Sequence, residues 1–285
     1  MHAIARQNIH TMVSASIYLT LSAMKHFYLL VFLAISVSCS QEKKKEKPQT
    51  ADVVSIQYNI LNTLPHDRAA FTEGLLIYKN KIYESTGQPG QSWIAEVNPD
   101  DGKTNKKIIL PEPYFGEGIT ILNNKIYQLT YTTGNGFVYD ASTYKKIKEF
   151  KYDPIIKQGW GLTHDTKHLI WSDGTDKIHF VDTTTLKVVK SITVVQGDKK
   201  VRWINELEYV DNFIFANVWQ TNTIIKINPT TGKVVGVLDL QKIAEEAARL
   251  SPNAEVLNGI AFDKNARALL VTGKYWTKMY VIRIY

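Results

Sequence analysis

Short apolar stretches alternate with polar turn residues along most of the chain, and the alternation has a period of two. In one such pair, Gly74–Tyr78 and Lys81–Ser85 flank a turn at Lys79-Asn80. Alternating stretches bounded by turn residues predict β-strands with one buried face. The same arrangement returns up to the C-terminus, so the sequence predicts an all-β domain over residues 53–285.

A three-residue phrase opens each group of predicted strands and occurs five times. Its first residues, spaced 44, 43, 45 and 53 positions apart, are Glu73, Glu117, Trp160, Asn205 and Asn258. A repeat of about 40–50 residues with several strands per unit is typical of β-propellers. The sequence therefore predicts a five-bladed β-propeller. Because the first strand of each blade lines the central channel, we expect these five residues to meet at one place.

Two departures from the repeat predict how the ring closes and where a helix is inserted. The fifth repeat lacks an outer strand, and the alternating stretch 54–61 is expected to supply it and remove an exposed edge. The longer fourth interval contains residues 240–250, which hold helix formers and no Gly or Pro. Their apolar positions follow the helical period. We expect one short inserted helix near the rim of the channel.

Residues 1–38 are predicted to be a leader. Lys25 precedes a short apolar run, and small residues then lead to Cys39, as in a secretory signal that ends at a lipidated cysteine. Met24 is the expected start, and residues 39–52 read as a flexible tether. This predicts an exported protein anchored by lipid to the cell envelope, facing the periplasm or the outside. The alternative is an ordinary signal peptide with a coincidental cysteine.

The charge of the chain argues against a nucleic-acid partner. The net charge is +7, and residues 1–38 contribute Arg6 and Lys25 and no acid, which leaves +5. Apart from the tether, no block of Lys and Arg stands out. Cys39 is the only cysteine, so the domain has no disulfide. We expect a monomer whose stability comes from buried apolar area.

Glu73 and Glu117 carry the candidate chemistry. Two carboxyls crowded near an axis cannot both ionise easily, so one should have a raised pKa and serve as a proton carrier. Alternatively, they bind water or a cation in the channel. Aromatic residues are expected at the same level, while four other tryptophans are expected only to fill gaps between sheets: Trp93, Trp171, Trp203 and Trp276.

The motifs around these residues resemble the plant-type glutaminyl-peptide cyclotransferases, a family with plant and bacterial members and a five-bladed propeller fold. The resemblance covers roughly residues 53–285. Seven segments carry it in order: Phe71–Leu75, Phe115–Gly118, Gly159–Leu162, Asn205–Tyr209, Ala216–Thr221, Leu257–Ala261 and Val271–Lys274.

This resemblance implies conversion of the N-terminal glutamine of peptides and proteins to pyroglutamate, with release of ammonia and no metal requirement. It implies that Glu117 moves the proton and that Glu73 holds the substrate's N-terminus. Asn205 and Lys274 would contact polar groups of the substrate and the developing oxyanion. The apolar walls would be Phe71, Phe115, Trp160 and Trp219. Tyr131 stands where the plant enzyme carries a tryptophan, which puts pocket size in question.

Two other functions fit the same ring of residues. A calcium-dependent propeller lactonase or related hydrolase would use the oxygens of Glu73, Glu117, Asn205 and Asn258 as cation ligands, and a structural cation in the channel is compatible with either enzyme. A non-catalytic binding propeller is the third, since a fold does not determine function.

Overall fold

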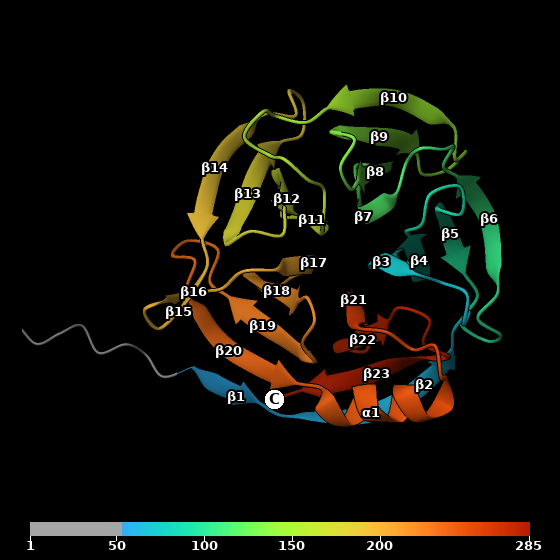
Figure 1. Ribbon diagram of the computed structural model, residues 1–285, viewed down its shortest axis with the longest axis vertical. Helices are drawn as coiled ribbons and strands as arrows, with labels where there is room; N and C mark the ends of the chain where they lie inside the picture. Colours follow the sequence, from blue (N-terminus) through green and yellow to red (C-terminus); the bar gives the residue numbers. More distant parts are fainter. Residues whose placement is uncertain (1–52) are drawn as a thin grey trace, which may run out of the picture. The chain divides into compact units, whose positions relative to one another are not determined.

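The computed structural model describes residues 53–285. The leader and tether predicted for residues 1–52 lie outside this part. The described chain forms five β-sheets that surround a common axis (Figure 1). The expected all-β, five-bladed propeller is confirmed.

Each blade is built on four strands in an antiparallel ladder, from the axis outwards, and the fourth blade carries one additional strand at its outer edge. The first blade contains β3 (Thr72–Tyr78), β4 (Lys81–Thr86), β5 (Trp93–Val97) and β6 (Thr104–Ile109). The second contains β7 (Gly116–Leu122), β8 (Lys125–Thr130), β9 (Asn135–Asp140) and β10 (Lys146–Lys151). The third contains β11 (Leu162–His164), β12 (His168–Ser172), β13 (Lys177–Asp182) and β14 (Val188–Thr193).

The last two blades complete the ring. The fourth contains β17 (Ile204–Val210), β18 (Phe213–Val218), β19 (Thr223–Ile227) and β20 (Val234–Asp239). The fifth contains β21 (Leu257–Asp263), β22 (Ala268–Gly273), β23 (Lys278–Ile284) and β2 (Tyr58–Pro65). A small hairpin, β15 (Val195–Gln196) and β16 (Lys199–Lys200), joins the third blade to the fourth.

The N-terminal strand closes the ring as expected, but with shifted bounds. β2 pairs antiparallel with β23, from Tyr58 opposite Ile284 to Pro65 opposite Lys278. The preceding strand β1 (Val54–Ile56) pairs instead with β20, parallel, as a fifth strand of the fourth blade. The predicted single stretch 54–61 is thus two strands. The chain crosses from one outer edge to the next, so that β1 covers β20 and β2 covers β23.

The inserted helix is α1 (Gln241–Leu250). Figure 1 shows it outside the ring, beside β2 and β23. Ile243 and Ala247 are buried in the same apolar cluster as Tyr280 of β23. None of residues 241–250 lines the central cavity described below, so the expected position of the helix near the rim of the channel is wrong. Glu255 and Val256, which follow the helix, do line the cavity. In residues 53–285, no helix is both long and apolar enough to cross a bilayer.

The glycine of the repeated phrase lets neighbouring blades touch at the axis. A Cβ on Gly118 would lie 2.5 Å from the backbone oxygen of Trp160, and one on Gly161 would lie 2.1 Å from the backbone oxygen of Asn205. Both distances are far shorter than any real contact, so these positions require glycine. In the fourth repeat Glu206 replaces the glycine, and its carboxyl reaches across the channel.

Candidate functional site

The first residues of the repeats lie where the innermost strands lose their regular pairing. The pairing of β3 with β4 shifts between Thr72 and Gly74, on either side of Glu73. The same irregularity occurs around Glu117 in β7 and Asn205 in β17. A β-bulge changes the direction of a side chain and is common beside functional sites. The bulges therefore explain how these side chains leave the strand alternation at one end of the channel.

A cavity of about 580 Å³ occupies this end of the channel. All nine residues predicted for catalysis or substrate binding line it: Phe71, Glu73, Phe115, Glu117, Tyr131, Trp160, Asn205, Trp219 and Lys274. They come from all five blades. The structure brings together residues that are as much as 203 positions apart in the sequence, between Phe71 and Lys274.

A buried ion pair lies at the wall of this cavity. Lys274 Nζ is 2.5 Å from Glu73 Oε1, and Asn258 Nδ2 donates to Glu73 Oε2 at 3.0 Å. Burial raises the pKa of Glu73 to about 7, although the Lys274 ammonium opposes the rise; the Glu255 carboxylate adds to it. Glu73 is thus held in place on both oxygens, and its charge is balanced by one cation.

Glu117 differs from Glu73 because no described residue donates a hydrogen bond to its carboxyl. Burial raises the pKa of Glu117 well above its usual range, and the charge of Glu73 raises it further, while Lys274 opposes the rise. The direction is the one expected from crowding two carboxyls near the axis. A buried carboxyl with a raised pKa and no protein partner can accept a proton from a ligand and return it.

Asn205 presents an unsatisfied acceptor to the same region. Its side chain is buried, and its Oδ1 has no hydrogen-bond partner in the described part of the chain. Leaving a buried acceptor unpaired costs about 1–3 kcal/mol. Such a group calls for an explanation, and a ligand N–H that binds it would supply one.

Aromatic rings form a continuous wall around the cavity. The ring of Phe71 meets that of Phe115 edge to face at 5.9 Å, and Phe115 lies 5.9 Å from Tyr131. Tyr131 continues to Trp160 at 6.3 Å, and Trp160 to Trp219 at 5.8 Å. Lys274 Nζ lies 4.1 Å from the centre of the Phe71 ring. These rings limit the access of water and strengthen the electrostatic interactions inside the cavity.

The expectation that four tryptophans only fill gaps between sheets is confirmed for Trp171 and Trp276 and wrong for Trp203, while Trp93 is buried but also lines a second cavity described below. Trp171 and Trp276 are each 1% exposed and do fill the space between sheets. Trp203 is 50% exposed and lines the cavity, 5.5 Å from Trp219. Trp203 directly precedes β17 and lies two residues before Asn205, so its ring lies at the mouth and not between sheets.

A signal in the sequence could have found Trp203 and two other missed residues. Phe71 and Phe115 each precede the first residue of their repeat by two positions. The equivalent residues of the other repeats are Gln158, Trp203 and Val256, and all three line the cavity. All five residues lie before the first strand of their blade, so the signal is their constant offset of two positions within the repeat. Gln220 and Glu255, the remaining lining residues, lie in loops and have no such signal.

Some oxygens at this mouth are free and others are engaged, since Oδ1 of Asn205 and Oδ1 of Asn258 have no hydrogen-bond partner in residues 53–285. Both oxygens of Glu73 already have nitrogen partners, and Asn258 donates its amide to Glu73 and to the backbone oxygen of Thr72. Across residues 53–285, no group of three or more His, Cys, Asp or Glu side chains is placed to hold a metal ion. The engaged oxygens of Glu73 are the one feature of this mouth that disfavours the calcium-dependent alternative.

Two further glutamates from β17 lie farther along the channel: Glu206 is fully buried, and Glu208 is partly buried. Glu206 accepts backbone hydrogen bonds from Leu75 at 3.2 Å and Ile260 at 2.8 Å, and so ties the fourth blade to the first and fifth. Glu208 accepts from the backbone of Phe262 at 2.9 Å. Burial raises the pKa of Glu208 to about 7 even though these hydrogen bonds oppose the rise.

Glu208 should make the stability of the domain depend on pH. The pKa of Glu208 is higher in the folded state than in the unfolded state. Its contribution to the free energy of unfolding is therefore fully present below about pH 4.5 and is lost as the pH rises through about 7. The loss is on the order of 3 kcal/mol, from a pKa change of roughly 2.5 units. We expect Glu208→Gln to reduce the fall in unfolding free energy between pH 4.5 and pH 8 by about this amount, measured by urea denaturation. An unchanged pH profile would contradict the assignment.

Comparison with known proteins adds three findings. A family model described as glutamine cyclotransferase matches residues 29–284. A glutaminyl-peptide cyclotransferase of Arabidopsis thaliana is 39% identical over 230 residues, which cover 80% of this chain and 71% of the relative. The crystal structure of a glutaminyl cyclase of Myxococcus xanthus superposes with a TM-score of 0.76 at 30% identity, covering 82% of this chain and 98% of that one.

Proposed function

The chain belongs to the glutamine cyclotransferase family, and we propose that it converts the N-terminal glutamine of peptides and proteins to pyroglutamate and ammonia. This is an acyl transfer, in which the side-chain acyl group of glutamine passes from the amide nitrogen to the α-amine. The observation that carries the proposal is Glu117: a buried carboxyl with a raised pKa and no protein partner, at an aromatic-walled cavity.

The reaction needs orientation and one proton carrier. The neutral α-amine attacks the side-chain amide carbon, and a C–N bond forms while the carbonyl oxygen becomes an oxyanion. The Glu117 carboxylate accepts the proton that the attacking nitrogen must lose, and then gives it to the amide nitrogen. The carbonyl re-forms, the old C–N bond breaks and ammonia leaves. Because the attack is intramolecular, holding the reacting atoms together supplies much of the acceleration.

The other residues have roles that follow from their contacts. Lys274 lies beside the cavity as a buried cation and would stabilise the oxyanion. The free Oδ1 of Asn205 would accept a hydrogen bond from the substrate's amide or amine. Glu73, held by Lys274 and Asn258, would attract the substrate's amino terminus. The aromatic wall would exclude water, so that hydrolysis of the amide does not compete.

The direct test is ammonia release from a dipeptide that begins with glutamine. We expect ammonia and a product whose mass is lower by one ammonia, in equal amounts. The matched control is the same dipeptide with N-terminal glutamate, which has no amide nitrogen to release. If purified protein releases no ammonia from any glutamine-initiated peptide, the proposed function is wrong and a binding propeller becomes the better interpretation.

We further propose that turnover requires no metal cofactor. The proton is moved by Glu117 and the oxyanion is stabilised by Lys274, so neither step depends on a cation. We expect the rate to be unchanged after treatment with EDTA and dialysis. A loss of activity that calcium restores would favour the calcium-dependent hydrolase, while a lower melting temperature with an unchanged rate would indicate only a structural cation in the channel.

We also propose that the protein acts as a monomer.

The protein is further proposed to be exported and attached to a membrane by lipid on Cys39. The support for export and lipid attachment is the leader pattern in residues 25–39, which precedes the described part. We expect Cys39→Ser to move the protein from the membrane fraction to the soluble fraction of cells, and to abolish its labelling by a radioactive fatty acid. Equal labelling of both proteins would contradict lipidation at Cys39.

A further inference from the structure

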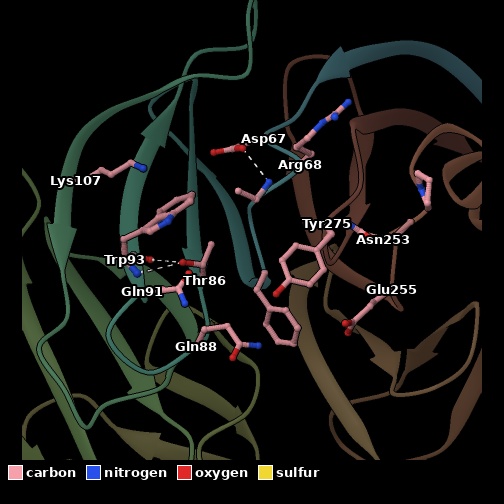
Figure 2. Close-up of a pocket in the computed structure, with 15 residues that line it drawn as sticks. Asp67, Arg68, Thr86, Gln88, Gln91, Trp93, Lys107, Asn253, Glu255 and Tyr275 are labelled. Carbon is pink, nitrogen blue, oxygen red and sulfur yellow. Dashed lines mark hydrogen bonds between the residues drawn. The ribbon is translucent and has the colours of Figure 1, made fainter.

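A second cavity of about 860 Å³ opens beside the first, between the first and fifth blades. The two cavities share Phe71 and Glu255, so one continues into the other. Figure 2 shows Trp93 and Lys107 on the wall that belongs to the first blade, and Tyr275 and Asn253 on the opposite wall. We call this cavity the radial groove, because it leads from the mouth of the channel outwards between two blades.

The charges of the radial groove are distributed unevenly along it. Arg68 and Lys107 are exposed, and neither has an ion-pair partner within residues 53–285. Lys107 Nζ lies 4.5 Å from the centre of the Trp93 ring. Asp67 is engaged with its own loop, where its Oδ1 accepts from the backbone of Ala69 at 2.9 Å. Glu255 lies at the inner end, where the groove meets the first cavity. The outer part therefore presents two exposed cations, Arg68 and Lys107, and one carboxylate, Asp67, which is bonded to its own loop.

The rest of the groove suits an extended peptide. Gln88 and Gln91 from the first blade and Asn253 from the opposite side offer amide groups that can bond a peptide backbone. The rings of Phe71 and Tyr275, 5.2 Å apart, form an apolar base. An extended chain advances about 3.3 Å per residue, and a groove of this volume is of the size that ordinarily holds a ligand.

We propose that the radial groove binds the residues that follow the N-terminal glutamine of the substrate, with Arg68 and Lys107 favouring acidic side chains at about the fourth and fifth positions. The inference rests on the proposed function, because it needs glutamine in the first cavity. A substrate chain must leave that cavity, and the groove is continuous with it. The preferred substrates are then N-termini of several residues, and free glutamine or a dipeptide leaves the groove empty.

The test compares four amidated peptides: Gln-Ala, Gln followed by four alanines, and the same pentapeptide with glutamate or with lysine at positions four and five. For each protein, kcat/KM is divided by its value for Gln-Ala. We expect the pentapeptides to be better substrates than the dipeptide, and the glutamate peptide to be better than the lysine peptide. Two exposed ion pairs are expected to contribute about 3- to 10-fold.

The informative variant is Arg68→Glu/Lys107→Glu, in which the preference for the glutamate peptide should disappear or reverse. Its control is Lys148→Glu/Lys199→Glu, which changes the net charge equally. Lys148 lies on β10, the outer strand of the second blade, as Lys107 lies on β6, the outer strand of the first, and Lys199 lies on β16. The control should keep the wild-type preference, because it alters only the overall field.

Four results would overturn the inference. Equal values of kcat/KM for the glutamate and lysine peptides in the wild type would show that the groove does not distinguish acidic from basic side chains. The same change in both double variants would assign the effect to net charge. Turnover of the dipeptide with no gain for any pentapeptide would refute the groove while leaving the proposed function intact. Absence of ammonia from every peptide would refute the proposed function, and the groove with it.

Discussion

Glu117→Gln should lower kcat for ammonia release from a glutamine-initiated dipeptide by about 10²- to 10⁴-fold, the usual contribution of a positioned proton carrier. Glutamine has nearly the same shape as glutamate but cannot accept a proton from the attacking amine. The substitution breaks no hydrogen bond to a described residue, and it removes a carboxyl that is costly to ionise where it is buried. We therefore expect KM and the melting temperature to change little, measured by steady-state kinetics and calorimetry.

The pH profile distinguishes this role from a structural one. The wild-type rate should fall as the pH drops through the raised pKa of Glu117, because the carboxylate form must accept the proton. The residual rate of Glu117→Gln should lack that acidic limb. Glu149→Gln, an exposed substitution on β10, serves as the control and should behave as wild type. Comparable rates in Glu117→Gln and wild type would remove Glu117 from the mechanism.

Lys274→Met should destabilise the domain by about 3–5 kcal/mol at pH 8 and abolish turnover. The substitution leaves Glu73 as a buried carboxylate without a cation. Removing one partner of a buried ion pair destabilises a protein strongly, because the remaining charge is buried without compensation. The pKa of Glu73 would rise above 7, because the opposing effect of the ammonium is gone. A carboxyl with a raised pKa destabilises the folded state only when it is ionised. The loss of unfolding free energy caused by Lys274→Met should therefore be smaller at pH 5, where Glu73 is protonated. Urea denaturation at both values measures this.

Two controls isolate the ion pair. Lys274→Met combined with Glu73→Gln should cost less than Lys274→Met alone, because the orphaned charge is removed; strictly additive costs would show that the two residues are not coupled. Lys278→Met breaks the pair with Glu246, whose side chains are 36% and 35% exposed. That pair is well solvated, so its loss should cost less than about 1 kcal/mol.

Much of the ring could be predicted because its determinants are local. The period-two alternation marks each strand, and the interval of the repeated phrase marks each blade. The glycine of that phrase is required at Gly118 and Gly161 by contact with the next blade, so a packing constraint is visible as a sequence pattern. The nine candidate site residues could be named from their places in the repeats and from the family resemblance, and all of them reach one cavity.

Errors arose where the answer depends on a contact between distant segments. Residues 54–60 alternate without a break, and nothing in them shows that Val54–Ile56 pairs with the fourth blade while β2 pairs with the fifth. Composition does not distinguish an indole between sheets from one at the mouth, so it does not predict the position of Trp203. The radial groove joins a loop at Arg68 to a strand at Lys107 and a loop at Asn253, which share no pattern.

The amino-acid sequence alone determined the strands, the number of blades and the residues that face the axis, since each depends on side-chain alternation and on a repeat that any single segment displays. Closure of the ring decided the rest. It placed Lys274 against Glu73, 201 positions away, raised the pKa of both mouth carboxyls by removing water, and left Glu117 without a protein partner. Electrostatic energies depend on distance and solvent exposure in three dimensions, and neither quantity is defined until the first and fifth blades meet.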